Sequence, residues 1–147
     1  MRYKDLQYIR QIELIENSPL FDNSKGNGYF MGKERAFVLQ TPTTNLYKPI
    51  RELAIKYFKE NNIDWWRGNS PSGHTLSSQI SCLNHLMPIM KDKKAVLTII
   101  NSIKNEFVTV HPINCDTTPR FIAFEVVSAE KNYLNERNNT RGALHIS

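Results

Sequence analysis

The chain has 147 residues, an ordinary share of apolar residues and a formal net charge of +5. This length fits one domain, so we expect a single domain over residues 1–147. No apolar run is long enough to span a bilayer, and the charged N-terminal segment lacks a signal-peptide core. We therefore expect a cytoplasmic protein without a membrane partner. The excess of basic over acidic residues is compatible with nucleic-acid binding, and equally with a basic surface that only contacts solvent.

Two cysteines, Cys82 and Cys115, are too few for a disulfide framework, so we expect buried thiols. The histidines have no zinc-finger or HExxH spacing. Cys82 and His85 lie three residues apart, but two further ligands would be needed for zinc. The chain contains the residue types of a Ser/His/Asp or Cys/His hydrolase, but no motif that would arrange them in a catalytic site.

Four segments have apolar spacings that predict amphipathic helices. They are Tyr3–Asn17, Leu46–Asn61, Thr75–Pro88 and Lys93–Glu106. Ser18-Pro19 should end the first helix, and Asp92 should cap the fourth. Pro49 is tolerable only in the first turn of the second helix. Between these helices, Phe21–Gly32 is predicted to be a loop, whereas Ala36–Gln40 is too short to assign by periodicity.

The segment Thr75–Pro88 is the one around which we expect the fold to be organised. Its buried stripe is Leu76, Ile80, Leu83 and Met87. Thr75 is the expected N-cap, and Pro88 should end the helix. The polar residues among the stripe are Ser77, Ser78, Gln79 and Asn84. These are either exposed or bonded to neighbouring segments, or Gln79 and Asn84 face an active-site or nucleic-acid groove.

Two segments predict strands, Phe107–Ile113 and Arg120–Val127, which the turn between them could join as an antiparallel hairpin. The second is apolar on both faces except for Glu125, as expected of a central strand. The predicted fold class is therefore mixed α/β (α+β), with about four helices packed on a small sheet in which Arg120–Val127 is central.

Glu125 is the most informative single residue, because a carboxylate within an apolar strand must be paired or bound to a metal. It is either a strand-end glutamate paired with Arg120, Arg137 or Arg141, or a magnesium ligand. Further oxygen ligands would then be needed, with Glu136, Asp116 and Glu106 as candidates.

The adjacent residues Trp65 and Trp66 cannot share one face of a strand. We expect one in the core and the other at a rim or interface. Stacking of a tryptophan on a nucleobase is the functional alternative.

Three motifs occur in the order of a known family. They are GHTLSSQISCLNHLMPI (Gly73–Ile89), RFIAFEVVS (Arg120–Ser128) and YLNERNNTRGA (Tyr133–Ala143). This ordered set resembles bacterial restriction endonucleases of the PD-(D/E)XK type. The segments Gly28–Gln40 and Asn45–Trp66 are similar to the N-terminal region of that family, so the resemblance covers nearly the whole chain.

The resemblance implies a magnesium-dependent phosphodiesterase, in which metal-bound water attacks the phosphate of DNA. Carried onto this sequence, the implied catalytic residues are Gln79, Glu125 and Glu136, with Glu125 as metal ligand. The implied nucleic-acid-binding residues are Ser78, Asn84, Trp66 and Arg141.

The sequence departs from the family pattern after Arg141-Gly142. The family continues with a TS-x-D stretch and an E-x-K strand, whereas this chain has no Asp after Glu136 and no E-x-K after Glu125. We therefore expect the N-terminal portion of a nuclease-like domain, truncated before those strands. Such a chain should lack a complete magnesium site and be inactive alone, while retaining DNA binding.

Two alternatives remain open. One is a non-catalytic protein-interaction or regulatory module, and the other is a metal-independent enzyme that uses His85 or Cys82. An open sheet edge left by absent strands would favour a homodimer or a partner chain that covers the edge.

Overall fold

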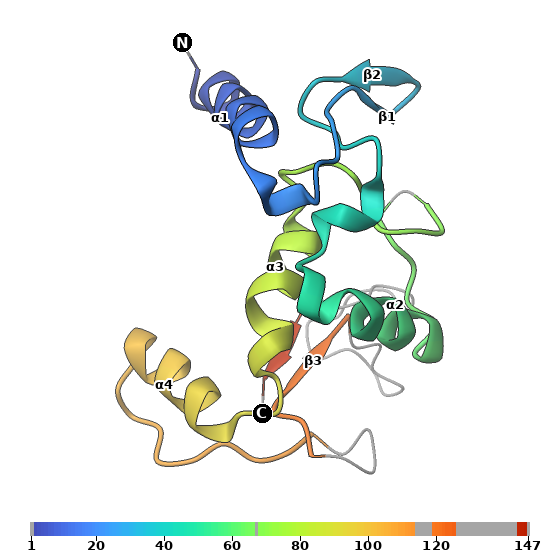
Figure 1. Cartoon of the computed structure of the whole chain (residues 1–147). Coiled ribbons are helices and arrows are strands. Elements are labelled where there is room, and N and C mark those ends of the chain that lie inside the picture. The colour runs from blue at the N-terminus through green and yellow to red at the C-terminus, as the bar shows by residue number, and fades with distance from the viewer. Residues whose placement is uncertain (1, 67, 114–118, 126–143, 147) are drawn as a thin grey trace, which may run out of the picture. The chain divides into compact units, whose positions relative to one another are not determined.

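The computed structural model describes residues 2–66, 68–113, 119–125 and 144–146 (Figure 1). The chain divides within its third helix into two compact units, Met1–Asn84 and His85–Ser147. Helices α1 to α4 and two pairs of short antiparallel strands make up the regular structure of the described residues. The mixed α/β fold predicted from the sequence is confirmed.

Helix α1 spans Tyr3–Asn17, the bounds that the apolar spacing predicts. Ser18 has an extended backbone, and its hydroxyl accepts the N–H of Leu20, so it ends α1 and caps the short turn Pro19–Phe21. Ile15 is the fully buried residue of the helix. The stop signal at Ser18-Pro19 thus acts as expected.

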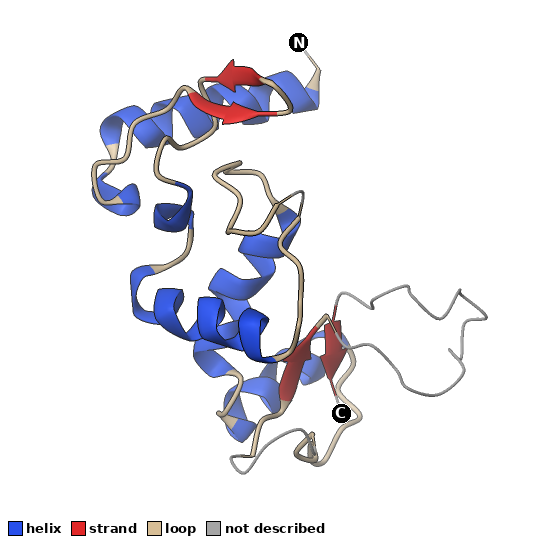
Figure 2. Cartoon of the chain, turned by 90° about the vertical axis from the view of Figure 1, so that its right-hand side faces the viewer, coloured by secondary structure: helices blue, strands red, loops and turns tan. Residues whose placement is uncertain are grey.

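A hairpin occupies part of the segment predicted to be a loop (Figure 2). Strand β1 is Gly28–Phe30 and strand β2 is Lys33–Arg35, paired antiparallel. The two residues between them both have positive φ, 53° at Met31 and 73° at Gly32. This geometry matches the two-residue hairpin turns whose twist suits the strands. The loop prediction is wrong here because Met-Gly lacks the usual Asn-Gly signal.

The hairpin is tied to a distant loop by close backbone approaches at two glycines. A Cβ on Gly28 would lie 2.3 Å from the carbonyl oxygen of Leu39, and one on Gly73 would lie 2.6 Å from the same oxygen. The N–H of Leu39 donates to Gly73 O, and Val38 forms an isolated bridge with His74. Apart from that bridge, the short run that periodicity could not assign has neither helix nor strand.

Helix α2 spans Arg51–Glu60, five residues later at its start than predicted. A short 3₁₀ turn, Lys48–Ile50, precedes it, with Pro49 in its first positions. Proline lacks the N–H that an α-helix needs beyond its first turn, which delays the helix. Asn61 ends α2 as expected, and its side chain donates to Tyr57 O.

Helix α3 spans Ser78–Leu86, shorter than the predicted Thr75–Pro88. The predicted N-cap, Thr75, is wrong: its hydroxyl donates instead to Phe37 O. Ser77 precedes the helix and accepts the N–H of Ile80, so it holds the capping position. Pro88 ends the α-helix and lies in the 3₁₀ turn Met87–Ile89.

In the second unit, helix α4 spans Lys93–Ile103 with Asp92 as N-cap, whose carboxylate accepts the N–H of Ala95. The helix ends three residues before the predicted Glu106. The apolar spacing that predicts this helix would bury Val96, Ile99, Ile100 and Ile103; Val96 is buried, but Ile99 and Ile103 are exposed, so this expectation is wrong toward the C-terminal end.

Strand β3 is Ile122–Phe124 and pairs antiparallel with β4, Leu144–Ile146. The predicted strand Arg120–Val127 is confirmed in its central part, and β4 is its one paired strand among the described residues. Glu125 has a φ of 50°, which takes the backbone out of strand geometry and ends β3 at Phe124.

The predicted strand Phe107–Ile113 is wrong apart from one isolated bridge between Ile113 and Arg120. The side chain of Asn101 explains this for Phe107, the first residue of the segment. It donates to Phe107 O and accepts the Phe107 N–H, and these are the groups that a neighbouring strand would need.

Within the described residues, no helix combines the length and apolar character needed to cross a bilayer.

Candidate nucleic-acid interface

The amide side chains of α3 hold neighbouring backbone segments in place. Gln79 Oε1 accepts the N–H of Trp66 at 3.0 Å. Asn84 Oδ1 accepts the N–H of Tyr47 at 2.8 Å, and its Nδ2 donates to Asn45 O at 2.9 Å. These bonds match the structural alternative, in which polar residues of this helix bond to neighbouring segments. Ser78, the first residue of α3, is exposed.

Glu125 lies half-buried just beyond β3 rather than inside the strand. Glu136 and Arg141, the other residues implied by the resemblance, lie outside the described residues, as do Arg137 and Cys115. Within the described ranges no three His, Cys, Asp or Glu side chains are placed to share a metal ion. The described residues therefore do not fit a magnesium site around Glu125, and we derive no step through a metal.

The adjacent tryptophans are separated as the sequence predicts. Trp65 is 7% exposed and its ring stacks on Phe58, with centroids 3.9 Å apart and an interplanar angle of 17°. Trp66 remains 43% exposed. A turn closed by the Gly68 N–H on Trp65 O follows, and Gln79 fixes the Trp66 backbone. The core thus holds one indole and presents the other.

Trp66 belongs to a group of rings drawn from four parts of the first unit, which we call the aromatic cluster. Its members are Tyr8, Phe30, Phe37, Trp66 and His74. The Tyr8 and Phe37 rings stack at 4.0 Å. Phe30 lies 5.3 Å from Trp66 and 4.8 Å from His74 between centroids. The cluster connects α1, the hairpin and the loop before α3.

His74 is the buried centre of the aromatic cluster. Its Nδ1 accepts the N–H of Leu76 at 3.2 Å, so a neutral ring carries its proton on Nε2. Burial lowers the pKa of His74 below the ordinary value; a hydrogen bond to its own backbone opposes this shift, and the charge of Lys4 adds to it. The ring is therefore a structural, neutral histidine rather than a cationic one.

A cavity of about 480 Å³ opens between the β1–β2 hairpin and the loop that precedes α3; we call it the hairpin cavity. Its lining is Tyr29, Phe30, Met31, Pro42, Trp66, Gly68, Ser70, Pro71, Ser72 and Gly73. Three large side chains in this lining are strongly exposed: Tyr29 at 74%, Met31 at 65% and Trp66 at 43%. Exposed rings and a thioether gathered on one cavity make it the candidate binding surface of this unit.

Met31 is held at the mouth of this cavity by an unfavourable backbone. A non-glycine residue in the left-handed region costs about 1 kcal/mol, and Asn or Gly is the usual occupant. The two-residue turn itself requires this positive φ, so the strain belongs to the hairpin that shapes the cavity. Sequence reasoning missed Tyr29, Phe30 and Met31 as site residues, because a three-residue strand is too short to give a periodic signal.

Two cations share a face of the hairpin with Phe30. The register pairs Phe30 with Lys33 and Gly28 with Arg35, and residues directly opposite in an antiparallel pair point to the same side. Lys33 and Arg35 are both exposed. The hairpin therefore presents positive charge on the face that also carries a ring of the aromatic cluster.

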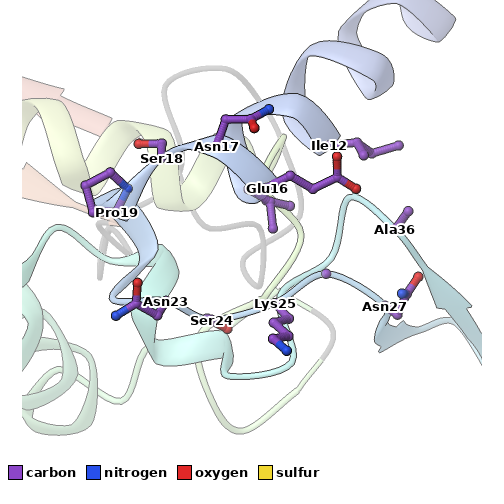
Figure 3. Close-up of a pocket in the computed structure, with 12 residues that line it drawn as sticks. Ile12, Glu16, Asn17, Ser18, Pro19, Asn23, Ser24, Lys25, Asn27 and Ala36 are labelled. Carbon is purple, nitrogen blue, oxygen red and sulfur yellow. The ribbon is translucent and has the colours of Figure 1, made fainter.

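A second cavity, of about 700 Å³, lies between the end of α1 and the segment Asn23–Asn27 (Figure 3). Glu16 projects from α1 into this space, and Ile12 and Ala36 contribute apolar surface. The last turn of α1 has no basic residue, and the carbonyl end of a helix repels anions. The helix end therefore disfavours a phosphate, whereas Lys25, which also lines this cavity, would attract one; among the described residues, the lining of the hairpin cavity contains no Lys or Arg. Neither Cys82 nor His85 lines either cavity.

The fold and this surface define a mixed α/β protein with a ring-lined cavity beside a short hairpin that also carries two exposed cations. A profile of the family described as Restriction Endonuclease associating with ARP matches residues 8–142. The chain belongs to that restriction-endonuclease-related family, which confirms the coarser part of the resemblance stated above. Comparisons with curated proteins and with solved structures found no match.

Proposed function

We propose that this chain binds DNA through the hairpin cavity and the cations beside it. The observation that carries the proposal is the gathering of Tyr29, Met31 and Trp66 on one cavity, with Lys33 and Arg35 on the same hairpin. Aromatic side chains stack on bases, and Lys and Arg neutralise phosphates. The family to which the chain belongs is named for restriction endonucleases, whose substrate is DNA.

Gln79 and Asn84 of α3 were expected either to bond to neighbouring segments or to face a nucleic-acid groove, and the choice affects where DNA would lie. Gln79 and Asn84 bond to backbone groups of the segments around Trp66 and Tyr47. We therefore propose that they act indirectly, by positioning these segments, rather than by touching DNA. The expected nucleic-acid contact moves from α3 to Trp66 and the hairpin.

For catalysis, we propose that the family's chemistry is DNA phosphodiester hydrolysis of the PD-(D/E)XK type with magnesium, and that this chain does not perform it alone. The support is the sequence after Glu125, which holds no E-x-K. Incubation with supercoiled plasmid and magnesium at low salt tests this point. Intact plasmid is expected; nicking that Glu125→Gln abolishes would refute the proposed inactivity.

The binding test measures the anisotropy of a labelled DNA duplex between about 50 and 200 mM salt. Wild-type affinity should fall steeply with salt. Removal of Lys33 and Arg35 by double alanine substitution should reduce the slope of log affinity against log salt by about two. The matched control is Lys56→Ala/Lys59→Ala, which removes two exposed cations of α2. A slope unchanged by the first variant, or changed equally by both, would refute the site.

A second function, protein association, is favoured by an exposed apolar surface on the second unit. Val108 is 92% exposed and Ile103 is 83% exposed, and the Asn101 side chain holds Phe107 beside the end of α4. An ordered apolar surface of this kind is typical of a protein contact. We propose that it binds ARP, the partner named in the family description.

Calorimetric titration of purified ARP tests the second function. Ile103→Asp/Val108→Asp should abolish binding, whereas Leu20→Asp, on an exposed leucine of the first unit, should not. Analytical ultracentrifugation of the chain alone distinguishes binding of ARP from self-association of the chain. A dimer broken by the same double substitution would assign the surface to a second copy instead.

A further inference from the structure

We propose that the hairpin cavity receives a single nucleobase extruded from the helix, so that the chain prefers DNA with a locally opened base pair over intact duplex. This inference rests on the proposed DNA binding and adds the form of DNA that is bound. It follows from the size, the walls and the rigidity of the cavity.

The size of the cavity suits a small planar group. Its volume of about 480 Å³ falls within the usual range of small-molecule sites. In an intact duplex both faces of each base are covered by stacked neighbours, and only the edges are open in the grooves. A ring that lines a cavity can therefore stack on a base only if that base leaves the helix or is already unpaired.

The walls supply the two kinds of contact that a base requires. Trp66, Tyr29 and Met31 offer exposed apolar and π surface for the faces of the base. Ser70 and Ser72 add hydroxyl groups for its edges. Ser72 Oγ already accepts the N–H of His74, and a hydroxyl can donate while it accepts. The lining thus combines apolar and polar surface in about equal measure, and the polar groups can contact the edges of a base.

Several hydrogen bonds hold these walls before any ligand arrives. Gln79 fixes the backbone of Trp66. The buried amide of Asn45 donates to Ser72 O at 2.8 Å and to His74 O at 3.0 Å, which anchors the opposite wall. The tight turn fixes Met31. Binding therefore orders little that is not already ordered, which favours affinity for a small group.

The position of the cations explains why a base with its phosphates fits better than a free apolar ligand. Lys33 and Arg35 are exposed on the hairpin face that carries Phe30, and Phe30 lies 5.3 Å from the Trp66 ring. Neither cation lines the cavity, so the groups that meet them would be phosphates of the nucleotides next to the bound base. The hairpin thus carries rings that line the cavity and cations that suit the neighbouring backbone.

The test compares three labelled DNAs by anisotropy at low salt: a paired duplex, the same duplex with one bulged 2-aminopurine, and the single strand containing that base. We expect the bulged duplex to bind about tenfold more tightly than the paired one, the range that one stacked base supplies. The fluorescence of the bulged 2-aminopurine should fall on binding, because the base stacks on a ring.

Two variants locate the effect. Trp66→Ala should remove the preference for the bulge and the fluorescence change, while paired-duplex affinity falls less. Tyr47→Ala is the matched control, since Tyr47 is exposed but does not line the cavity. Thermal melting of both variants verifies that they fold.

The outcomes separate this inference from the proposed function. Equal affinity for bulged and paired duplex, or a preference that Trp66→Ala leaves intact, would refute the base cavity while DNA binding stands. No binding of any of the three DNAs would refute the proposed DNA binding itself, and this inference with it.

Discussion

The buried amide of Asn45 offers the sharpest test of how the hairpin cavity is built. Asn45→Ala removes two donors and leaves the carbonyl groups of Ser72 and His74 without this partner. Each such bond contributes about 1–1.5 kcal/mol net, so the free energy of unfolding should fall by about 2–3 kcal/mol. For a chain of this length that lowers the melting temperature by about 4–12 °C.

Thermal and urea unfolding, followed by circular dichroism, measure this loss. Asn69→Ala is the matched control, because Asn69 is an exposed asparagine of the same loop, and should change stability by less than about 0.5 kcal/mol. Asn45→Asp replaces the two donors with acceptors facing carbonyl oxygens and should be at least as damaging as alanine. If Asn45→Ala is as stable as Asn69→Ala, the amide does not anchor the wall.

Three further experiments, with four substitutions in all, test the core around the cavity. Because the pKa of His74 is lowered in the folded state, its contribution to stability is complete above about pH 6.5 and is lost as the pH falls below that value. Urea unfolding at about pH 8 and pH 5 should therefore show a larger loss for wild type than for His74→Leu, and equal losses would contradict the shift. Trp65→Ala should cost about 3–5 kcal/mol, whereas Trp66→Ala should cost much less; similar costs would contradict their separation. Gly73→Ala should lower the melting temperature because its Cβ would lie 2.6 Å from Leu39 O, and an unchanged temperature would show that this backbone moves freely.

The helices show how far local sequence signals reach. The bounds of α1 match the prediction, and the caps at Asp92 and Asn61 act as expected. These features depend on residues a few positions apart, so a linear pattern contains them. The start of α3 was misplaced because Thr75 bonds to Phe37, far away in the sequence.

The strands show where local sequence signals fail to predict the structure. Asn101 captures both polar backbone groups of Phe107, so this residue cannot pair with a neighbouring strand despite the strand composition of its segment. The hairpin at Met31 was missed because its turn tolerates a residue that rarely adopts positive φ. In the first case one side chain outweighs average propensity, and in the second one backbone turn does.

Only part of the candidate site could be predicted from the sequence. The separation of Trp65 and Trp66 was predictable, because adjacent residues of extended backbone point to opposite sides. Which of the two is exposed was not, since that depends on the stacking of Trp65 on Phe58. The partners of Gln79 and Asn84 were open alternatives until the neighbouring segments were placed.

By itself, the sequence determined the mixed α/β class, the positions of four helices and membership of a restriction-endonuclease-related family. Spacing, caps and ordered motifs are properties of the linear chain. Only the tertiary structure decided that Tyr29, Met31 and Trp66 line one cavity. These residues come from a hairpin and a distant loop, and long-range packing and hydrogen bonds bring them together. No local sequence pattern predicts that these residues lie together. The free energy that holds them there comes from contacts between segments that are remote in the sequence.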